Sequence, residues 1–220
     1  MNENFNRDYR VPISESFCCD GHCCLLTSKS LGGSNYTAVQ LSDVMLSGDN
    51  ARVAALLAAG VCLPVCFPGD CALDEKTIFL VGELSEPEEK NWIARLAWKL
   101  KIPCGRLILC CGCFAEDLEP ALSDDPEAGN YGQFQIVEIP PGDYLVEIYA
   151  YLESVTVKLG LHRYTRTGDY IEDAEKRRWY ERNRPGLPDL GYLIRLKPLE
   201  APPPLPELNE GWFEKFEFRD

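Results

Sequence analysis

An alternating pattern across residues 134–150 constrains the fold of this chain more than any other stretch. In FQIVEIPPGDYLVEIYA, the apolar residues Tyr144, Val146, Ile148 and Ala150 recur at every second position after a Pro-Pro-Gly-Asp sequence. A period of two is typical of a half-buried β-strand, and the proline, glycine and aspartate residues between the two apolar segments are typical of a turn. We therefore predict a β-hairpin here, with an antiparallel sheet built around it.

Other segments carry strand or helix patterns of their own. Extended patterns cover residues 9–28, 36–41, 77–84, 105–114, 191–199 and 212–218, and helical patterns cover 47–60, 85–103 and 172–183. In the helix predicted at 85–103, Ser85 and Glu88 form a capping box and Pro103 ends the pattern. The order strand, helix, strand over 77–114 allows a parallel crossover. The predicted fold class is α+β, with about eight mostly antiparallel strands and about three helices packed on them.

The acidic segment 115–130 bears on domain organisation. It contains six acidic residues, two prolines and no basic residue, which predicts a solvated loop or linker. A chain of 220 residues with 45 % hydrophobic residues can bury one large core. We expect a single α+β domain over residues 1–220. The alternative is two lobes, at 1–114 and 131–220, joined by the acidic loop.

Charge narrows the range of partners. The chain has 22 basic and 35 acidic residues, a formal net charge of −13. This balance opposes general binding to nucleic acid or to an anionic membrane, and favours solubility or a partner with a basic surface. No apolar run approaches the ~20 residues of a membrane span, and MNENFNRDYRVP lacks the pattern of a secretory signal. We expect a soluble cytoplasmic protein without membrane contact.

The eleven cysteines are an odd number, so they cannot all pair within one chain. Cytoplasmic thiols are normally reduced, and a free cysteine packs as a small hydrophobic residue. Most are therefore expected to be free thiols that fill space in the core.

The segment FCCDGHCC, residues 17–24, concentrates four cysteines and one of the two histidines. With Asp20-Gly21 as a two-residue hairpin turn, Cys19, His22 and Cys24 share one face of the hairpin. They offer three ligands to zinc, with a fourth from another cysteine such as Cys62, Cys66, Cys71 or the group at 110–113. On the opposite face Cys18 and Cys23 form a facing pair that can close a disulfide. Simple packing of these cysteines is the third interpretation.

Motifs for common enzyme classes are absent from the sequence. Neither His22 nor His162 lies in H-E-x-x-H, and there is no G-x-S-x-G, P-loop or helix-opening G-x-G-x-x-G motif. A C-x-x-C sequence at Cys110–Cys113 ends an apolar strand pattern instead of opening a helix, which disfavours a thioredoxin-like site. A cysteine–histidine pair from distant segments stays open as a catalytic alternative. No catalytic residue is assigned.

The segment 163–184 combines arginines with aromatic residues. Arginine, tryptophan and tyrosine anchor many protein interfaces and also stack on nucleic-acid bases. The candidate partner-binding residues are Arg177, Arg178, Trp179, Tyr180 and Arg182. The alternative is an exposed helix whose charges pair with one another, because five acidic residues are interleaved with these.

Together these features favour a non-enzymatic interaction protein without a cofactor, of the kind that inhibits or confers immunity to a basic protein such as a toxin or nuclease. The alternative function is a zinc-binding protein or metal-dependent enzyme that uses Cys19, His22 and Cys24.

Overall fold

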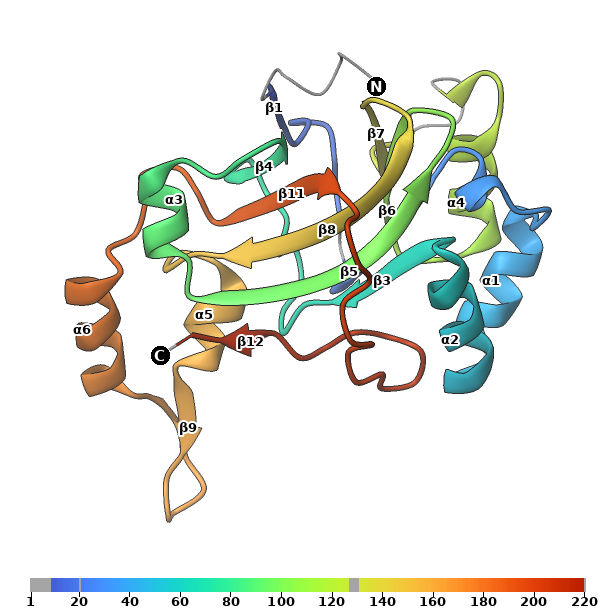
Figure 1. Cartoon of the computed structure of the whole chain (residues 1–220). Helices are drawn as coiled ribbons and strands as arrows, with labels where there is room; N and C mark the ends of the chain where they lie inside the picture. The colour runs from blue at the N-terminus through green and yellow to red at the C-terminus, as the bar shows by residue number, and fades with distance from the viewer. Residues whose placement is uncertain (1–8, 20, 127–130, 220) are drawn as a thin grey trace.

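Two sheets and a separate hairpin contain the strands of the computed structural model, which describes residues 9–19, 21–126 and 131–219. The first sheet has six strands in the order β1 (Tyr9–Pro12), β4 (Thr77–Val81), β11 (Tyr192–Pro198), β8 (Gly142–Ala150), β5 (Ala94–Ile102) and β12 (Glu217–Phe218). The second has the order β3 (Cys62–Cys66), β2 (Cys23–Ser28), β6 (Arg106–Cys111) and β7 (Phe134–Glu138) (Figure 1). Apart from the parallel pair β4–β11, the neighbouring strands are antiparallel.

Short helices connect and flank these strands. They are the 3-10 helix η2 (Leu31–Gly33) and the α-helices α1 (Ala38–Leu46), α2 (Asn50–Ala59), α3 (Glu86–Asn91), α4 (Ala115–Leu122), α5 (Val155–Gly160) and α6 (Ala174–Asn183). The predicted α+β class with mostly antiparallel strands is confirmed. The described part of the chain has twelve strands and six α-helices, more than the eight and three expected. None of its helices combines the length and the apolar character that crossing a bilayer requires.

Both strands of the predicted hairpin at 134–150 exist, but they do not pair with each other. β7 pairs with β6, and β8 pairs with β5 and β11. The β5–β8 pairing, which ends at Ile102↔Gly142, and the β6–β7 pairing, which begins at Arg106↔Glu138, share one register. Between these two pairs the Ile139 N–H donates to Gly105 O at 2.9 Å. The chain segments β5–β6 and β7–β8 therefore bend together, and each passes from one sheet into the other. The predicted Pro-Pro-Gly-Asp turn is this bend.

The helix predicted over 85–103 is wrong beyond its first turn and a half. The capping box is present, since the Glu88 carboxylate accepts the Ser85 N–H at 2.8 Å, but α3 ends at Asn91. The rest is β5, whose residues alternate between buried and half-buried from Ala94 to Ile102. Over this length the apolar residues fit both the helical period of 3.6 and the strand period of two. Hydrogen bonding to β8 favours the strand. The parallel crossover is also wrong, because β6 lies in the other sheet from β4.

Elsewhere the predictions have mixed outcomes. The helices at 47–60 and 172–183 and the strands at 77–84, 105–114 and 191–199 are confirmed as α2, α6, β4, β6 and β11. The extended segment at 36–41 is wrong, because Thr37 caps α1 by accepting the Gln40 N–H at 3.2 Å. The acidic segment begins with α4 instead of a loop, and residues 127–130 lie outside the described residues. Of the strand predicted at 212–218, only Glu217–Phe218 is a strand.

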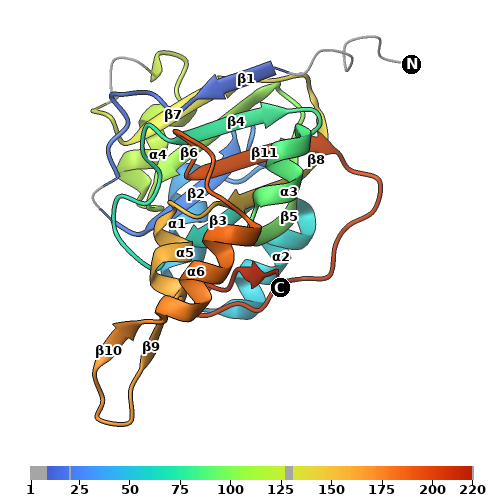
Figure 2. The ribbon, with the colours of Figure 1, turned by 90° about the vertical axis from the view of Figure 1, so that its left-hand side faces the viewer.

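The main hydrophobic core lies between the two sheets. Leu25 and Leu109 of the four-stranded sheet belong to the same buried cluster as Leu96, Ile148 and Ile194 of the six-stranded sheet. The helices α1, α2 and α4 lie beside the four-stranded sheet, whereas α5, α6 and the hairpin of β9 (His162–Tyr164) and β10 (Tyr170–Glu172) lie at another end of the molecule (Figures 1 and 2). This separates two regions with functional potential, which are the projecting hairpin and the cysteine-rich ends of β2 and β3.

Candidate functional site

The β9–β10 hairpin extends away from the rest of the molecule (Figure 2). Its two strands pair only with each other, from Tyr170↔Tyr164 to Glu172↔His162, and all three residues of β10 are exposed. The turn is ordered by its own side chains, because Thr165 Oγ1 accepts the Asp169 N–H at 3.0 Å and Thr167 Oγ1 donates to Asp169 Oδ2 at 2.6 Å. The hairpin is thus a structured projection with an exposed strand, β10.

Contacts with α5 fix the base of this hairpin. The His162 ring stacks on Tyr170 with centroids 5.0 Å apart, and its Nδ1 lies 2.7 Å from Lys158 O. The Tyr170 hydroxyl donates to Leu159 O at 3.1 Å. His162 therefore has a structural role at the start of β9.

The helix α6 continues directly from the hairpin and carries the five predicted partner-binding residues. Asp173 caps it by accepting the N–H groups of Glu175 and Lys176 at 3.2 and 3.1 Å. Three of the five predicted residues, Arg178, Trp179 and Arg182, are exposed. In the described part of the chain, neither Arg178 nor Arg182 forms a salt bridge.

The other two predicted residues are held within the protein. Arg177 pairs with Glu172 and with Glu181, both at 2.9 Å. Tyr180 is buried and its hydroxyl donates to Arg219 O at 3.2 Å. Arg177 thus fits the alternative interpretation, an exposed helix whose charges pair with one another. The exposed residues of α6 remain available for contact with a partner.

Sequence reasoning missed the apolar residues that extend this face. Tyr170 and Ile171 of β10 are 49 % and 44 % exposed, and Trp179 of α6 is 39 % exposed. The signal was present, because Tyr170-Ile171 follows a Gly168-Asp169 turn dipeptide and both side chains are typical of strands. We define the arm surface as Tyr170, Ile171, Arg178, Trp179 and Arg182.

The second region is the cysteine-rich segment, where the predicted hairpin at 17–24 does not form. Strand β2 begins at Cys23 and pairs with β3 and β6, while residues 17–19 belong to no strand. The predicted turn residue Asp20 lies outside the described residues. The predicted Cys18–Cys23 disulfide is wrong, because Cys23 faces Cys66 across β2 and β3 and is bonded to it.

Nine of the eleven cysteines are free thiols, which confirms that most are unpaired. Cys18, Cys71 and Cys104 are exposed, and the other six are buried. Burial raises the pKa of Cys62 to about 12, and burial with the nearby Asp117 raises the pKa of Cys113 to about 11. These buried thiols stay protonated at neutral pH and act as packing groups.

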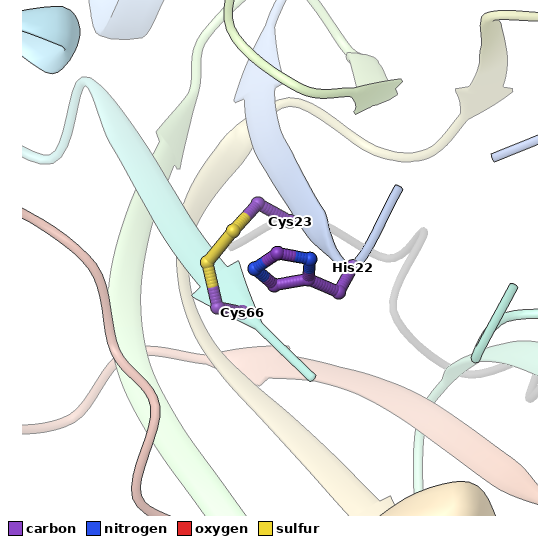
Figure 3. A group of neighbouring side chains, drawn as sticks. All are labelled: His22, Cys23 and Cys66. Atoms are coloured by element: carbon purple, nitrogen blue, oxygen red, sulfur yellow. A yellow bond between two sulfur atoms is a disulfide. The ribbon is translucent and has the colours of Figure 1, made fainter. Parts of the chain in front are cut away.

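The three predicted zinc ligands separate into two groups. Cys19 Sγ lies 3.6 Å from Cys24 Sγ and 2.8 Å from Cys111 Sγ in a buried cluster. The hydrogen bond from Cys111 favours the Cys19 thiolate, but the hydrogen bond with Cys24 and burial together raise its pKa to about 12. His22 instead lies beside Cys23 and Cys66 (Figure 3).

His22, Cys23 and Cys66 form a compact group. One potential ligand atom from each lies within 4.8 Å of the others, and among the described residues no other three cysteine, histidine or acidic side chains do so. His22 Nδ1 lies 3.5 Å from Asp70 Oδ1. Zinc binding by Cys19, His22 and Cys24 stays a prediction, and this second group is a different candidate.

Comparison with known proteins gives weak similarity only. No protein-family model and no curated protein matches this chain. Similar solved structures include a protein described as "Crocagin biosynthetic gene J", with 15 % identity and a TM-score of 0.37 over 87 % of this chain and 95 % of that one. They also include ComJ from Bacillus subtilis, described as an inhibitor of the DNA degrading activity of NucA, with 10 % identity and a TM-score of 0.33 over 88 % and 96 %. Similarity at this level does not transfer a function.

Proposed function

We propose that this chain is a non-enzymatic interaction protein that binds another protein through the arm surface. The observation that supports this most directly is the β9–β10 hairpin, which projects from the body (Figure 2) and exposes Tyr170 and Ile171, while α6, which follows it in the chain, exposes Trp179. Large apolar and aromatic side chains of this kind are the anchors that dominate the binding energy of many interfaces.

Rigidity supports the same proposal. The stacked His162–Tyr170 pair, the ordered turn and the cap of α6 hold the arm surface in one shape before binding. A surface that is ordered in advance loses less conformational entropy on association. We assign no catalytic role to the buried thiols of Cys62 and Cys113, whose pKa values are raised, or to His162, which makes structural contacts.

Charge defines the kind of partner we propose. Residues 163–184 contain seven basic and five acidic residues, whereas the whole chain has a net charge of −13. The proposed partner is a basic protein whose overall charge attracts the acidic body at long range. At the contact it presents an apolar patch for Trp179 and Ile171, with acidic groups near Arg178 and Arg182. An inhibitory or immunity role toward such a partner is the form of the proposal that follows from the charge.

Capture from a native lysate of the source organism tests the proposal when it is done with matched variants. The tagged wild-type chain is compared with the double variant Ile171→Ser/Trp179→Ala and with Tyr131→Ser. Tyr131 is a suitable control, since it is 86 % exposed and lies three residues before β7, a strand well separated from the β9–β10 hairpin in Figure 2. Circular dichroism verifies that each variant is folded.

We expect a partner that the wild type and Tyr131→Ser retain and the double variant loses. Removal of one interface anchor typically weakens binding by about 2 kcal/mol, or roughly 30-fold. The same partner retained by all three proteins would contradict the arm surface as the binding site. A wild-type protein that retains nothing at physiological salt would contradict the interaction function itself.

A further inference from the structure

The Cys23–Cys66 pair and His22 lie at the ends of β2 and β3, where His22 and Cys66 line an open pocket of about 560 Å³. Cys23 and Cys66 face each other in the strand register, with Cα atoms 4.0 Å apart. The Phe67 N–H donates to His22 O at 2.7 Å, which fixes the backbone of His22 next to this pair. The strand pairing therefore holds the two sulfur atoms and the imidazole together whether or not the sulfurs are bonded.

Side-chain orientation adds a second feature. Figure 3 shows one ring nitrogen of His22 directed toward the disulfide. The other nitrogen, Nδ1, lies 3.5 Å from Asp70 Oδ1. A carboxylate behind a histidine is the usual arrangement that orients an imidazole toward a metal ion. Glu214 also lines the pocket, so two acidic residues border the space in front of the sulfur atoms.

We propose that reduction of the Cys23–Cys66 disulfide creates a zinc site formed by Cys23 Sγ, Cys66 Sγ and His22 Nε2. Asp70 orients the imidazole through Nδ1, and a water molecule from the open pocket takes the fourth position. Cysteine sulfur and histidine nitrogen are the ligands zinc prefers, at about 2.3 and 2.1 Å. Tetrahedral bonds of these lengths require ligand atoms roughly 3.5–4 Å apart. The three atoms already lie within 4.8 Å of one another, and the two sulfurs must move apart to this spacing after their bond is broken.

The chemistry balances with a dithiol as the reductant. The dithiol transfers two electrons and two protons to the Cys23–Cys66 bond, the S–S bond breaks, and the reductant becomes a disulfide. Each resulting thiol then loses its proton when zinc binds, and the neutral imidazole of His22 contributes its lone pair. In the reverse direction a small-molecule disulfide accepts the two electrons by thiol–disulfide exchange, its two thiolates take protons from solvent, the Cys23–Cys66 bond re-forms and the metal is released. The proposed site is thus controlled by redox state, and it is independent of partner binding by the arm surface.

This ligand set differs from the one the sequence predicted. Cys19 and Cys24 lie in the buried cluster with Cys111, and only His22 is common to both sets. The two sets make opposite predictions for single cysteine variants. Cys24→Ser removes a ligand from the sequence-predicted site alone. Cys66→Ser removes a ligand that the proposed site requires, whereas in the sequence-predicted site Cys66 is only one of several choices for the fourth position.

Zinc titration against a chromophoric chelator measures the site directly, with the full chain purified in oxidised form and in dithiol-reduced, desalted form. Cobalt(II) provides a second readout, because cysteine ligands give it a sulfur-to-metal charge-transfer band. The variants are Cys66→Ser, His22→Asn, Asp70→Asn and Cys24→Ser, with Cys104→Ser as an exposed-cysteine control near the bend between β5 and β6. His22 is exposed, so His22→Asn remains informative even if Cys66→Ser is unstable.

We expect about one equivalent of zinc in the reduced wild type and less than about a tenth in the oxidised protein. His22→Asn and Cys66→Ser should weaken binding at least about 100-fold, Asp70→Asn about 10-fold, and Cys104→Ser and Cys24→Ser not at all. A reduced, folded wild-type protein that binds no zinc overturns the proposal. It is also overturned if Cys24→Ser abolishes binding and Cys66→Ser does not, a result that supports the sequence-predicted ligands.

Discussion

Two buried carboxylates, one in the six-stranded sheet and one in α3, each form more than one hydrogen bond with arginine. Glu147 of β8 is almost fully buried and accepts hydrogen bonds from Arg195 at 3.2 Å and Arg95 at 3.3 Å. Glu88 of α3 binds Arg10 of β1 through both carboxylate oxygens, at 2.7 and 2.8 Å. An unpaired carboxylate in either place would be strongly destabilising. The Glu147 pairs link the central strands β5, β8 and β11, and the Glu88 pair links the edge strand β1 to α3.

Glu88 gives a pH-dependent prediction. Burial opposes its ionisation, but the hydrogen bonds from Arg10 and Ser85 outweigh burial and hold the pKa of Glu88 below its usual value. A lowered folded-state pKa stabilises the protein above the unfolded pKa of about 4.3, and this contribution is lost as the pH falls through the folded-state value.

The variant Glu88→Gln should therefore reduce the free energy of unfolding at pH 7 by about 1–2 kcal/mol, a modest loss because Arg10 is partly exposed. The difference from wild type should shrink as the pH falls from neutral to below the unfolded-state pKa of about 4.3. Urea denaturation at neutral pH and below this pKa measures it, with the exposed Glu86→Gln of the same helix as the control. An equal difference at both pH values would contradict the assignment.

At the level of elements, the double bend at residues 103–105 and 139–141 determines the architecture. It allows two long strand segments to belong to both sheets, with the main core between them. Gly105 makes this possible, because its φ of +71° is in the left-handed region and a Cβ atom there would lie 2.9 Å from Ile139 O. That oxygen belongs to the backbone and cannot move without breaking the pairing.

We predict that Gly105→Ala lowers the free energy of unfolding by about 2–3 kcal/mol, from the left-handed conformation and the backbone contact together. Gly48→Ala is the matched control, since Gly48 has a φ of +65° and a Cβ atom there would have nothing within 4 Å. Its cost should be only about 1 kcal/mol. Equal costs in chemical denaturation would show that the contact with Ile139 is unimportant.

Local signals in the sequence predicted some elements correctly and others not. The helix predicted at 47–60 was correct because its caps act over a few residues: Asp49 accepts the N–H groups of Ala51 and Arg52 at its start, and Gly60 ends it in a left-handed conformation. The capping box of Ser85 and Glu88 was also correct, yet the strand that follows was attributed to the same helix. The residues of that strand, β5, are alternately buried and half-buried, and this period of two distinguishes the strand from a helix. The Thr37–Gln40 capping box of α1 was equally visible and was not used.

The sequence alone does not show which distant segments of the chain pair with each other. The bond from Cys23 to Cys66 spans 43 residues, and nothing in FCCDGHCC indicates which strand β2 will face. This is why the zinc ligands were expected at Cys19 and Cys24. The arm surface was predicted in part, because composition identifies arginine and tryptophan as candidates but does not show that Tyr180 points inward.

At the scale of the whole molecule, strands from both ends of the chain form the same sheets. β4 pairs with β11, and β5 and β6 pair with β8 and β7 across the acidic segment. Neither of the two segments considered as lobes, 1–114 and 131–220, completes a sheet alone. The projecting hairpin lies outside this shared core (Figure 2).

We therefore predict one cooperative unfolding transition for the chain. Far-ultraviolet circular dichroism and tryptophan fluorescence should give coincident urea denaturation curves, because loss of either half exposes the core of the other. Trp98 of β5 reports on the core and is 5 % exposed. Two separated transitions would instead indicate two lobes that fold independently.

Hydrogen–deuterium exchange of the chain, free and in complex with its captured partner, tests the proposed binding function without any substitution. We expect slower amide exchange on binding in β9, β10 and the outer face of α6, within residues 162–183, with β2 and β3 unchanged. Protection elsewhere on the molecule, with residues 162–183 exchanging as in the free protein, would show that the partner does not bind the arm surface.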